Sequence, residues 1–268
     1  MLRSMYSGIS GLRNFQTKLD VIGNNISNVN TFGFKKGRVV FKDLISQTTQ
    51  GATAPSGTIG GVNPKQIGLG SQLAAIDTIH DAGSTQTTNR TLDCAITGDG
   101  YFIVTNGTEN FYTRAGNFYL DSNGTLVTSD GMKVAIGEGE GEANEVTIPD
   151  TATQLTIGQD GTVSYLEGTQ LTPVGKIQIA RFSNPGGLTK VGGNYYQPSN
   201  NSGQPVPGNP GDTEKGLGKV QSGFLEMSNV DLSEEFTEMI VAQRGFQANS
   251  RIITTSDEIL QELVNLKR

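Results

Sequence analysis

Both ends of this chain carry apolar residues at the spacing of a long helix, and this pattern constrains the fold more than any other feature. Near the N-terminus, apolar residues recur every three or four positions from Met5 to Val29, which places them on one helix face. After Asp231, a suitable N-cap residue with Glu234 three positions later, a second helix is predicted to run to about Leu266. A long helix at each end is therefore part of the predicted fold.

The C-terminal helix repeats apolar residues every seven positions, at Met239, Phe246, Ile253 and Leu260. Such a repeat keeps a stripe on one side of a long helix and suits packing against another helix. The other seam positions are weak, and Gly245 inside the helix should cost about 1 kcal/mol relative to Ala. Two interpretations stay open: the terminal helices pack on their own chain, or they gain most of their order from neighbouring subunits.

The N-terminal helix runs into a cluster of asparagine and glycine in DVIGNNISNVNTFGFKK, from Asp20 to Lys36. Asn and Gly accept left-handed backbone angles and cap free helix ends, so this stretch is predicted to end the helix and redirect the chain. The short basic run of Lys35, Lys36, Arg38 and Lys42 is interpreted as a solvated face.

The middle of the chain alternates apolar and polar residues and is punctuated by Asp-Gly and Asn-Gly pairs, at 99–100, 106–107, 123–124 and 130–131. These pairs accept the positive backbone angles of tight hairpin turns, so a run of short antiparallel strands is predicted. The pattern indicates a β-rich domain over residues 91–196.

The expected fold class is α+β, with a discontinuous helical domain built from both chain ends. The helical domain takes residues 1–30 and 229–268. Residues 31–90 and 197–228, rich in small polar residues, glycine and proline, are expected to be extended connectors between the two domains.

Composition excludes several classes of function. A net charge of -6 and a pI near 4.9 argue against nucleic-acid binding, because phosphate neutralisation needs clustered Lys and Arg. The single cysteine, Cys94, rules out an intramolecular disulfide and is expected to be a small buried apolar residue. The N-terminal stretch lacks the apolar core of a secretory signal, and no stretch is long enough to span a bilayer, so we expect no membrane insertion.

Signals for catalysis are poor. His80 is the single histidine and has no cysteine near it in the sequence, so a histidine-based triad would have to be built on one isolated residue. We therefore predict that the protein is not an enzyme, and we assign no catalytic, cofactor-binding or metal-binding residue. A secreted β-rich adhesin or hydrolase remains a remote alternative.

Four stretches together resemble the bacterial flagellar axial family, which comprises the rod, hook and hook-associated proteins. LDVIGNNISNVNTFGFKK is similar to the family's N-terminal motif, and SNVDLSEEFTEMIVAQRGFQANSRIITTSDEILQELVNL to its C-terminal motif. The resemblance continues through LDCAITGDGYFIV and YTRAGNFYLDSNGTLV. Ser27 stands where Ala is common in the family, and Gly245 and Phe246 replace a usual Ala-Tyr-like pair.

The resemblance implies a structural subunit that self-assembles into a hollow helical tube. The terminal helices are implied to form an inner domain that stacks on neighbouring subunits around a central channel, with the β-domain as the outer wall. The implied subunit-packing residues are Leu12, Phe15, Leu19, Ile22, Ile26, Phe236, Met239, Phe246, Ile253 and Leu260. The implied hinge, which matches the N-terminal family motif, comprises Asn24, Asn25, Asn28, Thr31, Gly33, Phe34 and Lys35.

The resemblance also implies partners and a location. The partners are other copies of the chain, adjacent rod and hook–filament junction proteins, an assembly cap protein and the flagellar export apparatus. The location is the extracellular flagellum, in its hook or basal body, reached by export without a cleaved signal peptide.

Within the family, the stretch TNRTLDCAI looks like the hook version, and SGISGLRNFQTKLDVIGNNI looks hook-like as well. Length favours the other kind of subunit, because many hook proteins insert a further outer domain, whereas this chain has room for only one outer domain, as in the distal rod and in short hook proteins of some Gram-positive bacteria. We expect a short hook protein of the Gram-positive type, acting as a flexible universal joint between rod and filament. The alternative is a distal rod protein, a straight drive shaft.

Overall fold

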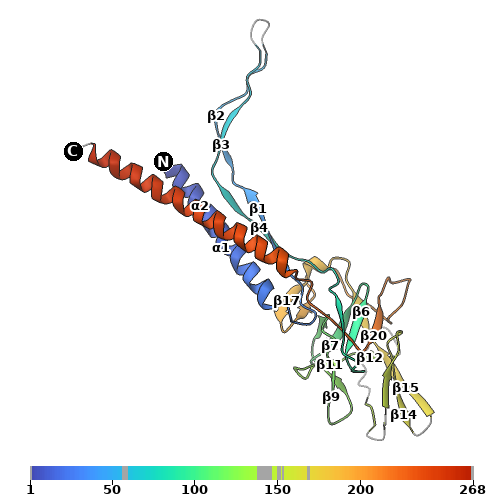
Figure 1. Ribbon diagram of the computed structural model, residues 1–268. Helices are drawn as coiled ribbons and strands as arrows, with labels where there is room; N and C mark the ends of the chain where they lie inside the picture. Colours follow the sequence, from blue (N-terminus) through green and yellow to red (C-terminus); the bar gives the residue numbers. More distant parts are fainter. Residues whose placement is uncertain are drawn as a thin grey trace. The chain divides into compact units, whose positions relative to one another are not determined.

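The computed structural model describes residues 2–55, 60–137, 147–149, 152, 154–167 and 170–266. Across these residues it is an α+β structure with a long helix at each end and antiparallel strands between them (Figure 1), which confirms the predicted fold class. The chain divides into two compact units. The first comprises residues 1–27, 37–78 and 231–268, and the second, called the β unit below, comprises residues 28–36 and 79–230.

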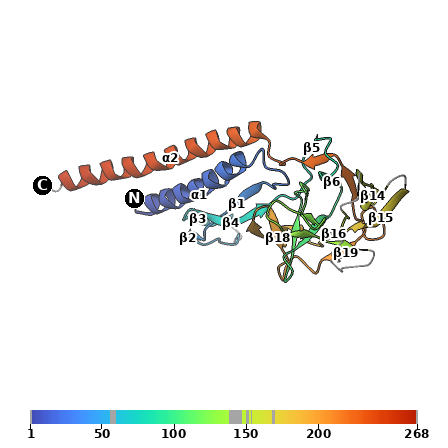
Figure 2. The ribbon, with the colours of Figure 1, turned by 90° about the horizontal axis from the view of Figure 1, so that it is seen from below.

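The first unit contains the two helices, α1 (Leu2–Ser27) and α2 (Leu232–Asn265), which lie side by side and antiparallel (Figures 1 and 2). The predicted N-cap is confirmed, because the Asp231 side chain accepts hydrogen bonds from the backbone N–H groups of Ser233 and Glu234. No helix in the described part of the chain is both long and apolar enough to cross a membrane.

Two strand pairs complete the first unit. β1 (Gly37–Asp43) pairs with β4 (Ser71–Thr78), and β2 (Ser46–Gln50) pairs with β3 (Lys65–Gly68). This part of residues 31–90 thus differs from the extended connector expected from the sequence. β2, β3 and β4 are mostly exposed, and β1 carries its apolar residues in one run, Val39 to Phe41, so none of the four shows the apolar alternation by which strands are recognised.

The β unit contains four sheets, and every strand pairing among its described residues is antiparallel. The largest sheet has nine strands in the order β17-β18-β8-β7-β11-β10-β9, with β16 pairing with β7 and β19. Its strands are β7 (Tyr101–Thr105), β8 (Asn110–Thr113), β9 (Tyr119–Leu120), β10 (Leu126–Val127), β11 (Lys133–Val134), β16 (Ile179–Arg181), β17 (Thr189–Gly192), β18 (Tyr195–Gln197) and β19 (Val206–Gly208).

A four-stranded sheet and two strand pairs make up the rest of the β unit. The four-stranded sheet has the order β12-β15-β14-β13, and its strands are β12 (Ile136–Gly137), β13 (Gln154–Ile157), β14 (Thr162–Glu167) and β15 (Gln170–Ile177). The two pairs are β20 (Lys219–Ser222) with β6 (Cys94–Thr97), and β21 (Phe224–Glu226) with β5 (Thr85–Thr87). A short 3-10 helix spans Pro185–Gly187.

The hydrophobic core of the β unit includes residues from a range that the sequence predicted to be an extended connector. Cys94 is fully buried in the main core cluster, as predicted, together with Phe102 and Ile179. Leu217 and Val220 belong to the same cluster although they lie in the range 197–228. Strands of three or four residues among glycines and prolines give too little periodicity to be recognised before their partners are known.

Candidate assembly surface and a buried ion cluster

Three glycines, Gly8, Gly11 and Gly245, lie at the contact between α1 and α2, each against a larger side chain of the other helix. A Cβ atom on Gly8 would lie 3.4 Å from the side chain of Ile253, and one on Gly11 would lie 2.8 Å from Oδ1 of Asn249. One on Gly245 would lie 2.5 Å from the ring of Phe15. The two helices therefore approach closely through glycine, which explains a residue that helix propensity alone disfavours.

The structure places the ten predicted packing residues at different depths. Ile22 is buried, whereas Phe236 and Phe246 are 49% and 37% exposed. The remaining seven are half-buried: Leu12, Phe15, Leu19, Ile26, Met239, Ile253 and Leu260. The single chain thus covers only part of the predicted stripe, and the role of these residues in subunit packing stays a prediction.

The helix pair leaves further large apolar side chains exposed. On α1 these are Tyr6 and Ile9, and on α2 they include Ile240, Val241, Ile252, Ile259, Leu263 and Val264. Exposed apolar side chains in this number on a helix pair are typical of a surface that another protein covers. These exposed residues, together with Phe236 and Phe246, form the candidate assembly surface.

The strands of the first unit pack on α1 through polar and aromatic contacts. Asn14 is buried and donates a hydrogen bond from Nδ2 to Oγ of Ser71 over 2.8 Å. Phe15 meets Phe41 of β1 edge to face, with ring centroids 6.4 Å apart. Phe15 therefore contacts both α2 and β1.

Asn25, one of the predicted hinge residues, joins three elements of the first unit. Its Oδ1 accepts a hydrogen bond from the backbone N–H of Gly37 over 2.9 Å, and its Nδ2 donates to the backbone O of the same residue over 2.9 Å. Nδ2 also lies 3.2 Å from Oε2 of Glu235 on α2. Because Asn25 and Glu235 are both buried, Asn25 fixes the start of β1 against both helices.

Except for Asn24, the other predicted hinge residues follow α1, where the chain turns. The backbone N–H of Thr31 donates to the backbone O of Asn28, and the Thr31 hydroxyl lies 3.2 Å from Oδ1 of Asn28. Gly33 has a φ of 69°, and a Cβ atom there would lie 2.5 Å from the backbone N of Ala115. Phe34 is buried, whereas Asn24 is exposed on the last turn of α1. The predicted helix stop is therefore present, because α1 ends at Ser27.

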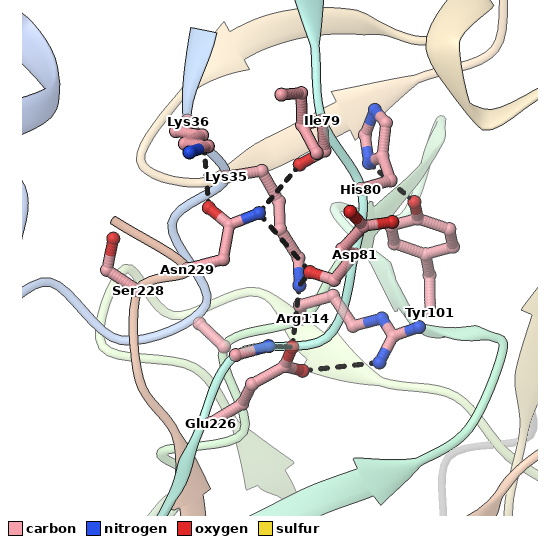
Figure 3. Close-up of polar contacts among 12 residues, drawn as sticks. Lys35, Lys36, Ile79, His80, Asp81, Tyr101, Arg114, Glu226, Ser228 and Asn229 are labelled. Carbon is pink, nitrogen blue, oxygen red and sulfur yellow. Dashed lines mark hydrogen bonds and ion pairs between the residues drawn. The ribbon is translucent and has the colours of Figure 1, made fainter. Parts of the chain in front are cut away.

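Lys35 corrects the interpretation of the basic run as a solvated face. Its side chain is fully buried, and Nζ lies 2.6 Å from Oε1 of Glu226 and 2.7 Å from the backbone O of Asp81 (Figure 3). Glu226 also binds Arg114, whose Nη1 lies 3.2 Å from Oε2 of the carboxylate. Tertiary contacts override the local sequence pattern here, because a carboxylate from a distant segment neutralises the lysine.

Asn229 binds the same region of the β unit. Its Oδ1 accepts a hydrogen bond from the backbone N–H of Lys36 over 2.8 Å, and its Nδ2 donates to the backbone O of Ile79 over 2.9 Å (Figure 3). The backbone N–H of Ile79 in turn donates to the backbone O of Lys36. Three segments of the chain are thus hydrogen-bonded to one another, and sequence reasoning missed Arg114 and Asn229 because their partners lie far away along the chain.

Burial shapes the electrostatics of this cluster. Desolvation lowers the pKa of Lys35, although the Glu226 carboxylate opposes the effect. Burial, together with the nearby cations Lys35, Lys190 and Arg114, lowers the pKa of His80 to about 4, so the imidazole is neutral at pH 7. Its Nδ1 lies 2.7 Å from the hydroxyl of Tyr101. Lys35 is thus fully buried in the β unit, whereas His80 is half-buried there.

Three protein-family models match this chain, one near its N-terminus, one in its middle and one near its C-terminus. Residues 5–35 match the flagella basal body rod protein family, residues 95–165 the flagellar hook protein FlgE/F/G D1 domain, and residues 221–266 the flagellar basal body rod FlgEFG protein C-terminal family. The flagellar basal-body rod protein FlgG of Bacillus subtilis strain 168 is 62% identical over 270 residues, covering 100% of both chains.

The chain belongs to the flagellar rod and hook protein family. Members from Borreliella burgdorferi include the flagellar basal-body rod protein FlgG, 42% identical over 276 residues, and the flagellar hook protein FlgE, 32% identical over 443 residues. Each alignment covers 100% of both chains. This rod and hook family member is therefore a structural subunit of the flagellum and not an enzyme, and the resemblance to the axial family is confirmed.

Proposed function

We propose that this chain is a rod subunit of the flagellar basal body, the distal rod protein, and that it serves as part of a straight drive shaft. The observation that carries the proposal is the 62% identity to the Bacillus subtilis rod protein over the full length of both chains. This assignment replaces the expected hook protein with the alternative of a distal rod.

The lengths of the relatives support the same assignment. The alignment with the Bacillus subtilis rod protein extends over 270 residues, close to the 268 residues of this chain. The alignments with two hook proteins extend over 443 and 465 residues, so those hook proteins carry insertions that this chain lacks. The absence of such insertions fits a rod subunit better than a hook subunit.

The strands of the first unit also bear on the choice between rod and hook. The sequence suggests a polar, glycine-bearing linker from about Phe41 to Thr85, and such a linker would let neighbouring subunits slide, as a bending hook requires. Residues 37–43 and 71–78 instead form an antiparallel pair, and large apolar side chains are exposed at Ile67 of β3 and Ile76 of β4, and at Ile45 between β1 and β2. Exposed apolar side chains on paired strands are suited to fixed contacts between subunits.

We propose further that the exposed apolar residues of the helix pair bind other copies of the chain in a hollow helical homopolymer. In that polymer, residues 1–30 and 229–268 form the inner domain around a channel, and residues 91–196 contribute to the outer wall. The other proposed partners are the adjacent rod and junction proteins, an assembly cap and the export apparatus. The proposed location is the flagellum, which the subunit reaches through that export apparatus.

Deletion of the gene, followed by electron microscopy of isolated basal bodies, tests the choice between rod and hook. A distal rod subunit predicts a shortened rod and no hook, and restoration of both by a plasmid copy of the unchanged gene. Purified polymers of the chain should be straight. A complete straight rod that lacks only the curved segment, or purified polymers that are bent, would instead assign the chain to the hook.

A further inference from the structure

The β unit is completed by a segment that comes late in the sequence, residues 217–229, called the closing segment here. Within it, β20 pairs with β6, with Ser222 opposite Cys94. Its β21 pairs with β5. Val220 of this segment is fully buried in the same core cluster as Cys94. The closing segment therefore supplies both strand partners and core side chains to strands more than a hundred residues earlier.

Backbone hydrogen bonds hold the closing segment along its length. The N–H of Gly218 donates to the O of Asp99 over 2.8 Å, and the N–H of Gly223 donates to the O of Asp93 over 2.7 Å. Near its end, the N–H of Met227 donates to the O of Ser84 over 2.8 Å. Without the segment, these carbonyl groups lose their partners in the β unit.

The charges of the β unit also depend on the closing segment. Glu226 is 1% exposed and contacts Lys35, which is fully buried, and Arg114, which is 3% exposed. Its Oε1 also accepts a hydrogen bond from the backbone N–H of Gly83 over 3.0 Å. If Glu226 were absent, two buried cations would lose their carboxylate partner, which is strongly unfavourable in a protein interior.

We infer that the closing segment controls folding of the β unit, which cannot bury its core until residues 217–229 have docked. We call this dependence the interlock. Ribosomes make this segment after all the strands that it completes. An unfinished chain therefore keeps Cys94 and the Lys35 region open to solvent, and closure becomes favourable only when Glu226 arrives. The interlock rests on contacts within the β unit and applies equally to a rod or a hook subunit.

The interlock delays folding of the β unit until the chain is nearly complete. A subunit that passes unfolded through an export channel benefits from this delay, because closed β-structure formed early would resist passage. Lys35 contributes to the delay, since the carboxylate that pairs with its buried ammonium group belongs to Glu226 of the closing segment.

Cys94 provides a direct probe, because it is the one cysteine of the chain and is fully buried. Burial raises the pKa of its thiol to about 12, so it should react with thiol reagents only when the β unit opens. The experiment uses the full-length chain carrying Phe224→Trp, whose fluorescence reports docking of β21 in a protein that has no other tryptophan. The chain is refolded and Cys94 is labelled with pulses of a maleimide.

The interlock predicts that Cys94 becomes protected in the same kinetic phase in which the Phe224→Trp fluorescence changes. In Glu226→Gln, both events should slow at least tenfold, and Cys94 of the refolded protein should react at least tenfold faster. Glu214→Gln, which changes an exposed glutamate of the same unit, should stay within twofold of the unchanged chain. The double variant Lys35→Met/Glu226→Gln should recover part of the protection, because it removes one of the cations left without a carboxylate.

Protection of Cys94 before the fluorescence change would overturn the inference, since the β unit would then close without the segment. Refolding rates and Cys94 reactivity of Glu226→Gln equal to those of Glu214→Gln would overturn it as well. If Glu226→Gln alone does not refold, the order of the two signals in the Phe224→Trp chain still decides the question.

Discussion

The ring of Phe15 lies over the backbone of Gly245, so a Cβ atom at position 245 would come within 2.5 Å of Cζ and 2.7 Å of Cε1 of that ring. Phe15 cannot simply move aside, because its ring also packs edge to face against Phe41. This relationship determines how closely α1 and α2 approach. It also shows that the glycine that weakens the isolated helix is required by the packing of the pair.

Replacing Gly245 with Ala should destabilise the helix pair. The substitution gains about 1 kcal/mol of helix propensity, but overpacking costs about 1–3 kcal/mol, and the 2.5 Å approach to Phe15 places the cost in the upper part of that range, so we expect a net loss of up to about 2 kcal/mol. Gly23→Ala in α1 is the matched control, because a Cβ there meets nothing within 4 Å and should stabilise by up to about 1 kcal/mol. Thermal unfolding followed at 222 nm measures both; a higher midpoint for Gly245→Ala would contradict the packing argument.

Replacing Asn25 with Ala should release the start of β1 from α1. The change leaves the N–H and O of Gly37 and the buried Glu235 without their amide partner, and we expect a loss of about 2–4 kcal/mol. Asn24→Ala, at an exposed position on the same turn, should cost well under half as much. Urea unfolding measures the difference, and equal losses for the two variants would show that Asn25 does not hold β1.

Replacing Phe236 with Glu tests the candidate assembly surface. Phe236 is 49% exposed in the single chain, so the monomer should lose only about 1 kcal/mol, the value of burying roughly half of the side chain. In the polymer the new charge would be buried without a partner, and polymer yield should fall at least tenfold. Gln247→Glu, which adds a charge at another exposed position of α2, is the control. Sedimentation measures yield, and a normal yield for Phe236→Glu would remove this position from the subunit contacts.

Acid should weaken the β unit through His80. Its pKa is about 4 in the folded protein and 6.5 in the unfolded chain, so the unfolded state binds more protons between these values. Stability from the neutral imidazole is therefore fully present above pH 6.5 and is lost as the pH falls towards 4, by about 2–3 kcal/mol in all. Lys35, Lys190 and Arg114 oppose protonation, and Asp81 favours it.

The single histidine makes this prediction simple to check. The NMR signals of the His80 ring, followed against pH, should give a midpoint near 4, and urea unfolding at pH 7 and pH 4.5 should show the loss of stability. His80→Gln should lose less stability over the same interval, because one titrating group is removed. A ring midpoint near 6.5 would contradict burial of the neutral imidazole.

Much of the secondary structure follows from neighbours in the sequence. The apolar spacing from Met5 onward and the Asp231 N-cap correctly predicted α1 and α2, since both signals act within a few residues along the chain. Cys94 was correctly predicted to be buried, because its apolar neighbours indicate an interior strand. The four family-like stretches identified the axial family in the same way, since they can be read without any tertiary contact.

The sequence by itself determined the two terminal helices, the β-rich middle, the burial of Cys94 and the family. Tertiary structure alone decided which distant groups meet. Lys35 is buried because Glu226, far along the chain, neutralises it, and Gly245 is required because Phe15 lies over it. The pairing of residues 37–43 with 71–78 likewise joins distant segments, and it brings Ser71 to Asn14 of α1. The physical reason is that a local pattern records what each residue prefers, whereas burial, charge pairing and close packing are properties of two or more segments brought together.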